Sequence, residues 1–305
     1  MTSKKKMKKK ALEEERKRKS KALTNSIFWL VFALIILFSF YRSNLTFKTT
    51  TYTVKSPRIP NAFNQFTIAQ VSDLDGHIYG ERGIKLKEAI DQVKPDIVVL
   101  TGSLQSFKDK NAKALANSFE EIAKTYPTYY IRGNAELYRD AKVQNQKDFY
   151  QALKDAGVIF AENESVPILR QGASITLSGL VPDPSYYEAD PKTTDLPVGQ
   201  FLEKPAGKDY RILLAHHPLY WEDYKKWGAD LTLSGYVHGG GLRWLFVGGV
   251  FTPKGSLFPK YDRGLYTDKE KSMIVSAGMG RAGTPFRLFN PQELVVIQLE
   301  SQNIH

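Results

Sequence analysis

Five short polar motifs carry the residues of this chain that could do chemistry. Each stands where a predicted strand runs into a loop, and together they supply carboxylates, an amide and imidazoles. Hard oxygen ligands and imidazoles suit divalent cations such as Mn²⁺, Mg²⁺ or Ca²⁺. Because ligands bind at the carboxyl ends of strands in α/β sheets, the pattern predicts a site there. The motifs are Asp73-Leu74-Asp75, Gly102-Ser103, Gly133-Asn134-Ala135-Glu136, Ala215-His216-His217 and Gly235-Tyr236-Val237-His238-Gly239-Gly240.

The order and spacing of these motifs resemble the calcineurin-like metallophosphoesterases, whose pattern is D-x-H, G-D, G-N-H-E, H and G-H-x-H. Further motifs within 257–266 and 278–291 resemble one branch of that family, the membrane-anchored bacterial proteins that act at the cell envelope. The resemblance extends from about Thr67 to the C-terminus. It implies an α/β (α+β) four-layer sandwich, in which two packed mixed sheets lie between helices and the metals sit at the strand ends.

The resemblance also implies two metal sites that share a bridging carboxylate. The first site maps onto Asp73, Asp75 and His238, which could hold one divalent cation. The second retains only Asn134 and His216, which could also contact a phosphate. Four positions depart from the family pattern, namely Asp75, Ser103, Ala135 and Tyr236. Of these, Tyr236 is a poor ligand because a phenol with a pKa of about 10 is neutral.

Ser103 is the departure with the largest expected effect. It stands where the family has the carboxylate that offsets the repulsion between two cations roughly 3.5–4 Å apart. Ala135 replaces the family's histidine, whose help as an acid is worth roughly 10²–10⁴ in rate. Without that imidazole, Glu136 is expected to pair with Arg132 or Arg139. A dinuclear centre is therefore not expected, and no residue is assigned a catalytic role.

Other polar residues near the motifs offer no clear replacement ligand. His77 is interpreted as an exposed loop residue. His217 is expected to pack beside Pro218, because neighbouring strand residues face opposite sides. Five cationic residues could hold an anion without a metal or be ordinary surface charge, and these are Arg243, Lys260, Arg263, Arg281 and Arg287.

Three functions are compatible with these motifs. The favoured one is a pseudoenzyme that binds or regulates a cell-envelope protein partner or a phosphorylated ligand. The alternative is a reduced, one-metal phosphoesterase, a hydrolase in which the cation acts as a Lewis acid on an envelope phosphoester. A passive scaffold is the third, favoured if Tyr236 and apolar neighbours fill the cleft. The proline-rich segment 182–205 is predicted as a surface loop over or beside the site, and its role as a lid stays open.

The N-terminal part of the chain predicts a membrane anchor. Residues 1–22 contain eleven Lys or Arg and three Glu, a local charge of +8 out of +11 for the chain. Residues 1–23 are predicted as a cytoplasmic tail that also touches anionic lipid, and 24–42 as an uncleaved transmembrane signal anchor. Residues 43–62 are predicted as a juxtamembrane linker, and 63–305 as the extracellular metallophosphoesterase-like domain. Nucleic-acid binding is not expected, because the basic residues belong to the tail. An exported chain without cysteine suits a Gram-positive-type bacterium.

Strand and helix patterns alternate through the domain, as a layered α/β or α+β fold requires. Helical spacing is found at 83–93, 111–126 and 149–156. Short apolar runs predict strands at 66–71, 96–101, 128–131, 158–160, 174–180, 210–215, 231–234 and 273–277, and a partly alternating edge strand at 293–300.

Overall fold

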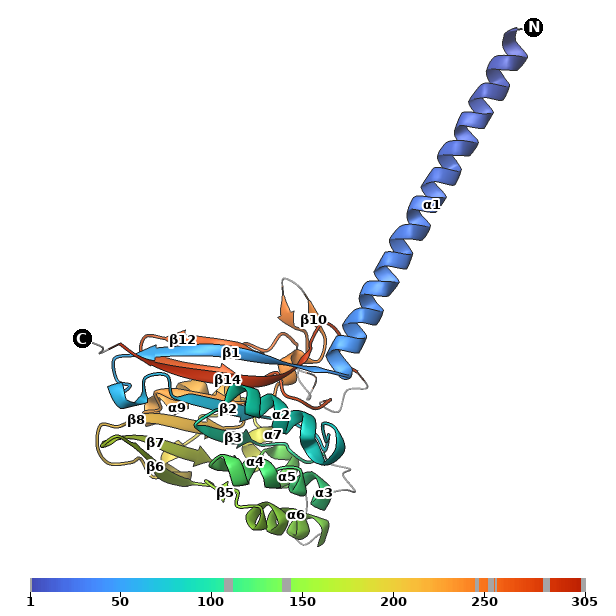
Figure 1. Ribbon diagram of the computed structural model, residues 1–305. Coiled ribbons are helices and arrows are strands. Elements are labelled where there is room, and N and C mark those ends of the chain that lie inside the picture. Colours follow the sequence, from blue (N-terminus) through green and yellow to red (C-terminus); the bar gives the residue numbers. More distant parts are fainter. Residues whose placement is uncertain are drawn as a thin grey trace.

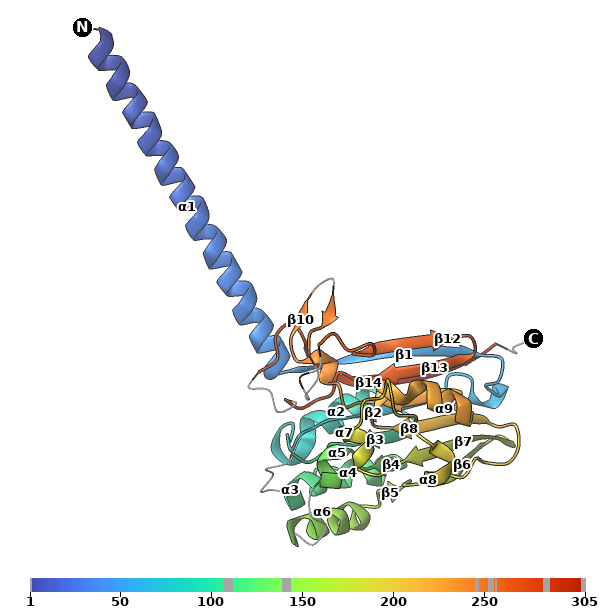
Figure 2. The ribbon, with the colours of Figure 1, turned by 180° about the vertical axis from the view of Figure 1, so that it is seen from behind.

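The computed structural model describes residues 2–106, 112–138, 144–244, 247–251, 255, 257–281 and 286–302. A long N-terminal helix, α1 (Thr2–Asn44), projects from a layered domain (Figure 1). The view from behind shows the same arrangement, with the hairpin labelled β10 beside the base of α1 (Figure 2).

The first sheet has six strands in the order β1-β14-β2-β3-β4-β5. Strands β2 to β5 run parallel, while β14 is antiparallel to β2 and parallel to β1. The strands are β1 (Phe47–Ser56), β2 (Thr67–Val71), β3 (Ile97–Thr101), β4 (Thr128–Ile131), β5 (Ile159–Phe160) and β14 (Gln292–Ser301).

The second sheet has the order β12-β13-β9-β8-β7-β6 and is also mixed. Its four inner strands are parallel, and its two edge strands are antiparallel to their neighbours. The strands are β6 (Glu164–Arg170), β7 (Ala173–Leu180), β8 (Tyr210–Ala215), β9 (Leu231–Ser234), β12 (Gly264–Asp268) and β13 (Lys271–Val275). A separate small hairpin is formed by β10 (Arg243–Trp244) and β11 (Gly248–Gly249).

Alternate strand residues of the two sheets meet in one apolar core, which includes Ile68, Val99, Leu214 and Leu233. The opposite faces are covered by helices, with α2, α3, α4 and α6 on the first sheet and α8 and α9 on the second. This order of helices, sheet, sheet and helices confirms the predicted four-layer sandwich. The helices are α2 (Ile84–Val93), α3 (Ala112–Asn117), α4 (Glu120–Thr125), α5 (Asn134–Tyr138), α6 (Gln144–Asp155), α7 (Ser185–Glu188), α8 (Val198–Phe201) and α9 (Trp221–Trp227), with 3₁₀ turns η1 (Asn61–Phe63), η2 (Glu81–Gly83), η3 (Pro218–Tyr220) and η4 (His238–Gly240).

The segment 43–62 differs from the predicted linker. Its Thr-rich stretch forms β1, which pairs with β14 over ten residues from Phe47 to Ser56. The alternating pattern is that of an edge strand, and Val54 is buried against the inter-sheet core. The folded domain therefore begins near Phe47, before the predicted boundary at 63.

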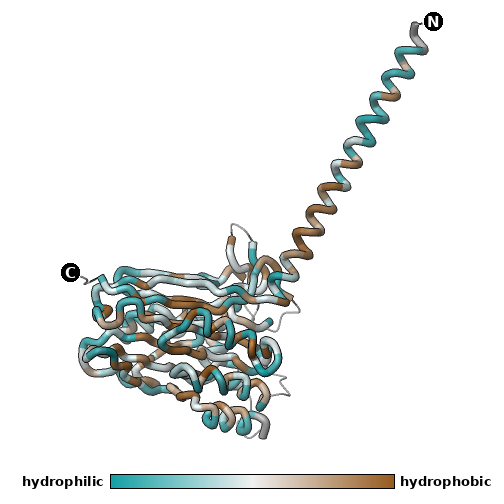
Figure 3. The backbone as a smooth tube through the Cα atoms, viewed as in Figure 1, coloured by the Kyte–Doolittle hydropathy of each residue, from teal (hydrophilic) through white to brown (hydrophobic). Residues whose placement is uncertain are grey.

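The base of α1 is fixed to the domain by buried polar contacts. The Asn44 side chain donates Nδ2–H to the Arg287 carbonyl and accepts from the Arg287 N–H, both at 2.8 Å. The Ser39 hydroxyl oxygen accepts from the Phe289 N–H at 2.7 Å. The helix is long and apolar enough to cross a membrane, and Figure 3 shows its apolar band next to the domain and its hydrophilic end beyond.

Two further segments differ from their prediction. The predicted helix 111–126, whose first residue lies outside the described residues, is split into α3 and α4 by Ser118 and Phe119. The proline-rich segment 182–205 is not a simple surface loop, because it forms α7 and α8 and buries Tyr187 and Leu202.

Candidate functional site

The motif residues meet because both sheets direct strand ends to one place. Asp73 follows β2, Ser103 follows β3 and Asn134 follows β4, while His216 follows β8 and His238 follows β9. Apart from Asn134, these side chains are buried. The sequence predicted this convergence from the position of each motif at the end of a strand.

Backbone conformation sets the directions of the site side chains. Five non-glycine residues of the site have positive φ, namely Asp73 (51°), Asp75 (50°), Ser103 (52°), Tyr236 (71°) and His238 (53°). This left-handed region costs free energy in most L-residues, and such strain clusters at functional sites. A Cβ at Gly235 would overlap the Ser72 hydroxyl and the Asp73 carboxylate, so only glycine allows the strands to approach this closely.

His216 is held as a neutral ring with one nitrogen directed into the site. Its Nδ1 lies 2.6 Å from the Thr101 carbonyl oxygen, which assigns the proton to Nδ1. The lone pair on Nε2 then faces the Ser103 hydroxyl at 2.9 Å and the Asn134 Oδ1 at 3.1 Å. Burial lowers the pKa of His216 to about 4, which keeps the ring neutral at pH 7.

Asp73 lies between the two imidazoles of the site. Its Oδ1 is 3.6 Å from His216 Nε2 and 3.3 Å from His238 Nε2. Its Oδ2 accepts from the Ser72 hydroxyl at 2.6 Å. Burial raises the pKa of Asp73 to about 7. The Asn134, His216, Ser103 and Asp73 side chains thus form a cluster rich in hydrogen-bond acceptors.

Asp75 approaches His238 from the other side of the ring. Its Oδ2 is 3.6 Å from His238 Nδ1, whereas Asp73 faces Nε2. An imidazole binds a metal through one nitrogen only. In this arrangement Asp73 and Asp75 face different nitrogens of His238, so the three residues predicted to bind a single ion do not converge on one point.

Tyr236 and His217 form an aromatic layer over His216. The two rings stack at 4.2 Å with an interplanar angle of 26°, and Tyr236 meets His216 edge-on at 5.8 Å. His217, which was expected to pack beside Pro218, lies between β8 and η3, and its ring stacks on that of Tyr236, which follows β9. Tyr187 of α7 adds a third ring, 5.7 Å from Tyr236. No sequence pattern predicted a role for Tyr187, since its proline-rich segment lacks periodicity.

One cationic residue of the predicted set is inside the molecule. Arg287 is completely buried, and its Nη1 donates to the Ala277 carbonyl at 2.7 Å. Its Nε and Nη2 have no hydrogen-bond partner among the described residues. The guanidinium lowers the pKa of Asp73, although burial of that carboxylate has the larger, opposite effect. Arg287 therefore supplies a buried positive charge behind the carboxylates of the site, so of the two sequence interpretations ordinary surface charge is excluded for this residue.

The calcineurin-like phosphoesterase family model matches residues 66–250, which include all five motifs. The chain belongs to this family. An uncharacterized metallophosphoesterase of Aquifex aeolicus is 30% identical over 264 residues, covering 82% of this chain and 91% of the relative. The uncharacterized metallophosphoesterase YkuE of Bacillus subtilis is 27% identical, and the match covers 84% of this chain and 86% of the relative.

Two further comparisons found similar proteins. The phosphodiesterase YaeI of Escherichia coli is 29% identical over 192 residues, which cover 61% of this chain and 64% of the relative. The solved structure of TT1561 from Thermus thermophilus has 12% sequence identity and a TM-score of 0.44, covering 72% of this chain and 91% of that one.

Ser103 is the residue that the family resemblance assigns to the bridging position. Its hydroxyl contacts His216 Nε2 at 2.9 Å and Asn134 Oδ1 at 3.0 Å. The hydroxyl has a single proton to share between these two acceptors. It carries no charge, so it cannot offset the repulsion between two cations.

Glu136 has a structural role that the sequence did not predict. Its carboxylate accepts three backbone N–H groups, from Ser103 (2.9 Å), Gly133 (2.8 Å) and Gln105 (3.0 Å). The expected pairing with Arg132 is wrong, because Arg132 pairs with Glu162 at 2.7 Å. Arg139 lies outside the described residues. Ala135 beside it is buried and offers no proton donor.

The residues present do not fit the family's dinuclear metal centre. Members of the family generally use divalent metals, but in the described ranges no three His, Asp or Glu side chains are arranged to hold an ion. The positions that the resemblance assigns to the bridging anion and to one imidazole hold Ser103 and Tyr236. The acceptor atoms of Asp73, Asn134 and His216 remain close together at the strand ends.

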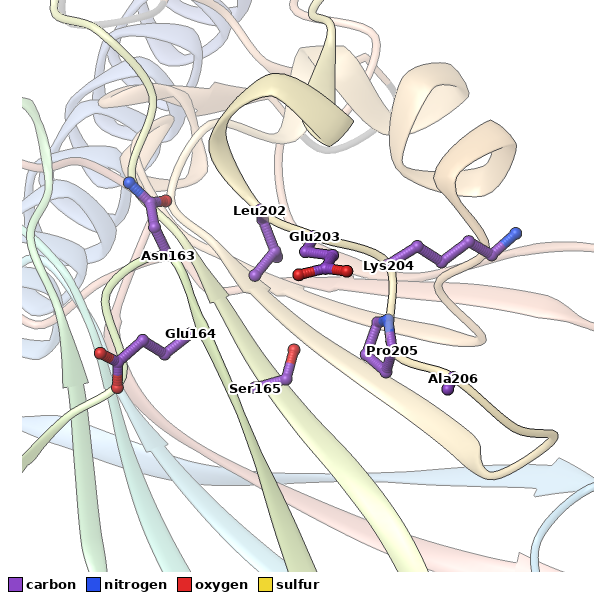
Figure 4. A pocket seen from close by; sticks show the side chains of 8 residues that line it. All are labelled: Asn163, Glu164, Ser165, Leu202, Glu203, Lys204, Pro205 and Ala206. Carbon is purple, nitrogen blue, oxygen red and sulfur yellow. The ribbon is translucent and has the colours of Figure 1, made fainter.

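The pocket in Figure 4 is separate from this cluster. It has a volume of ≈ 440 Å³ and lies between the start of β6 and the segment after α8. Its lining contains none of the motif residues, and Figure 4 shows the Lys204 side chain extending away from it.

Proposed function

We propose that this chain is a membrane-anchored, extracytoplasmic member of the calcineurin-like phosphoesterase family that has lost the two-metal reaction. Its domain then acts by binding a cell-envelope partner or a phosphorylated ligand. The observation that carries this proposal is Ser103, which stands at the bridging position and is hydrogen-bonded to His216 and Asn134.

Two more observations support the loss of catalysis. The ring of Tyr236 is stacked on His217 and only 3% exposed, so it fills the place of a metal-binding imidazole. Ala135 removes the acid that would protonate a leaving group. The anchoring part of the proposal is supported by α1, which is long and apolar enough to cross a membrane. Its basic end is then expected on the cytoplasmic side.

A one-metal phosphoesterase is the second candidate. It is favoured by the acceptor cluster, in which Asp73, Asn134 and His216 lone pairs lie close together with few protons between them. A single cation there would supply Lewis acidity toward a phosphoryl oxygen.

The deciding experiment measures bound Mn²⁺ and phosphodiester hydrolysis with the full chain in detergent. Bis-(p-nitrophenyl) phosphate is the substrate, and Asp73→Asn is the matched control. We expect no Mn²⁺-dependent hydrolysis above the rate of the control. Two ions per chain, with hydrolysis lost in Asp73→Asn, would overturn the proposal. One ion with hydrolysis that also requires His216 would establish the second candidate.

A further inference from the structure

Large apolar side chains are exposed at the end of the domain where α1 leaves it. We call them the apolar rim. Their exposed fractions range from 37% to 66%. They belong to the β10–β11 hairpin, the chain after it and the segment before β14. The rim comprises Trp244, Val247, Leu257, Phe258, Phe286 and Phe289.

The rim is physically continuous with the helix. The rings of Phe40 and Phe286 are 6.1 Å apart, and the Phe289 N–H donates to the Ser39 hydroxyl oxygen. The same segment joins the hairpin, because the Arg243 N–H donates to the Leu288 carbonyl at 3.0 Å. Figures 1 and 2 both show the hairpin on the side of the domain from which α1 projects.

The composition around the rim matches a membrane–water interface. Trp244 is 62% exposed, and tryptophan is enriched at membrane–water interfaces, where its amphipathic ring lies at the level of the lipid headgroups. Arg42 at the end of α1, Lys260 and Arg281 are exposed cationic residues in the same segments. Such residues are attracted to anionic lipid headgroups.

We propose that the apolar rim inserts into the interface of the bilayer that α1 spans, so that the domain has a second membrane contact. This inference rests on the proposed membrane anchoring. Lipid is the occupant because the rim adjoins the exit point of the helix, and the Asn44 and Ser39 hydrogen bonds hold it there. The domain is then fixed in its orientation and does not tumble on a tether.

The test uses the absence of native cysteine, which makes single-cysteine labelling specific. Full-length Val247→Cys and Leu257→Cys are labelled with an environment-sensitive fluorophore. They are placed in phosphatidylcholine–phosphatidylglycerol vesicles with or without doxyl-labelled lipid. The matched control is Leu169→Cys, which is 76% exposed on β6, an edge strand of the second sheet. Leu34→Cys in the apolar band of α1 reports on anchoring.

We expect doxyl lipid to reduce the fluorescence at 247 and 257 about twofold or more, since interfacial segments are buried ~5–10 Å, with no change at 169. If the label at 34 is quenched but the labels at 247 and 257 are quenched no more than the label at 169, the rim contact is overturned. The membrane anchor would still be supported by that result. A blue-shifted but unquenched label at 247 and 257 would also overturn it, by showing a protein-covered rim. No quenching at 34 would refute the anchor itself.

Discussion

Ser103→Asp places a carboxylate where the family resemblance has the bridging anion, and on the proposed function we expect Mn²⁺ to stabilise this variant but not the natural chain. The Ser103 side chain is 3% exposed and contacts His216 and Asn134 at 2.9 and 3.0 Å. A carboxylate at this position would be buried near Asp73, and the side chains of His216 and Asn134, which contact Ser103, would not neutralise its charge. Without metal, the variant should therefore be less stable than the natural chain.

The magnitude follows from that burial. An uncompensated buried charge costs about 3–5 kcal/mol. For a domain of this size, each kcal/mol changes the Tm by roughly 2–4 °C, so Ser103→Asp should lower the Tm by roughly 6–20 °C. A cation present at a hundred times its Kd stabilises the folded variant by about 2.7 kcal/mol, which should raise its Tm by roughly 5–10 °C.

The assay is thermal unfolding of the full chain in detergent, with Mn²⁺ or with a chelator. Ser103→Asn is the matched control, because it has the same shape without the charge. We expect a Mn²⁺-dependent rise in Tm for Ser103→Asp alone. An equal rise in the natural chain, or in Ser103→Asn, would refute the reasoning that the bridging anion is the missing part.

Three further predictions concern contacts that shape the site. Glu136→Gln should lower the free energy of unfolding in urea by about 2–3 kcal/mol, since one oxygen that accepts backbone N–H groups becomes a donor; an unchanged midpoint would contradict this role. Gly235→Ala should destabilise by about 1–3 kcal/mol because of overlap at Ser72, whereas Gly199→Ala, with open space around it, should be neutral or stabilising by ~0.4–1 kcal/mol; equal effects of both would show that close packing at Gly235 is unimportant. Asn44→Ala removes two buried hydrogen bonds worth about 1 kcal/mol each, so amide exchange at residue 287 should be roughly thirtyfold faster; unchanged exchange would mean that α1 does not hold this segment.

The sequence predicted the fold and the meeting of the motifs because their signals are local. An apolar run that ends in Asp73 or His216 places that residue at a strand end without knowledge of the rest of the chain. The α/β alternation then leaves few arrangements of layers. The departure at Ser103 could also be recognised from spacing alone.

The remaining features depend on contacts between distant segments. Tyr187 packs on Tyr236 from a segment without periodicity, and the backbone of the buried Arg287 is bound by Asn44 at the base of α1. The strand β1 was predicted as a linker because its partner lies at the other end of the chain. The opposite approach of Asp73 and Asp75 to His238 depends on positive φ values that sequence does not reveal.

The pairing of β1 with β14 has a consequence for biosynthesis. Strand β1 cannot pair with β14 until β14 has been synthesised. The paired residues Lys55 and Glu300 are 245 residues apart in the chain. At a synthesis rate of ~5–20 residues per second this delay is roughly 10–50 s. During that time β14 is not yet available to separate β1 from β2, and the open edge of β2 is exposed to unwanted pairing. The sheet is thus completed only after β14 has been synthesised, and a chaperone would have its longest opportunity to bind at the edge of β2.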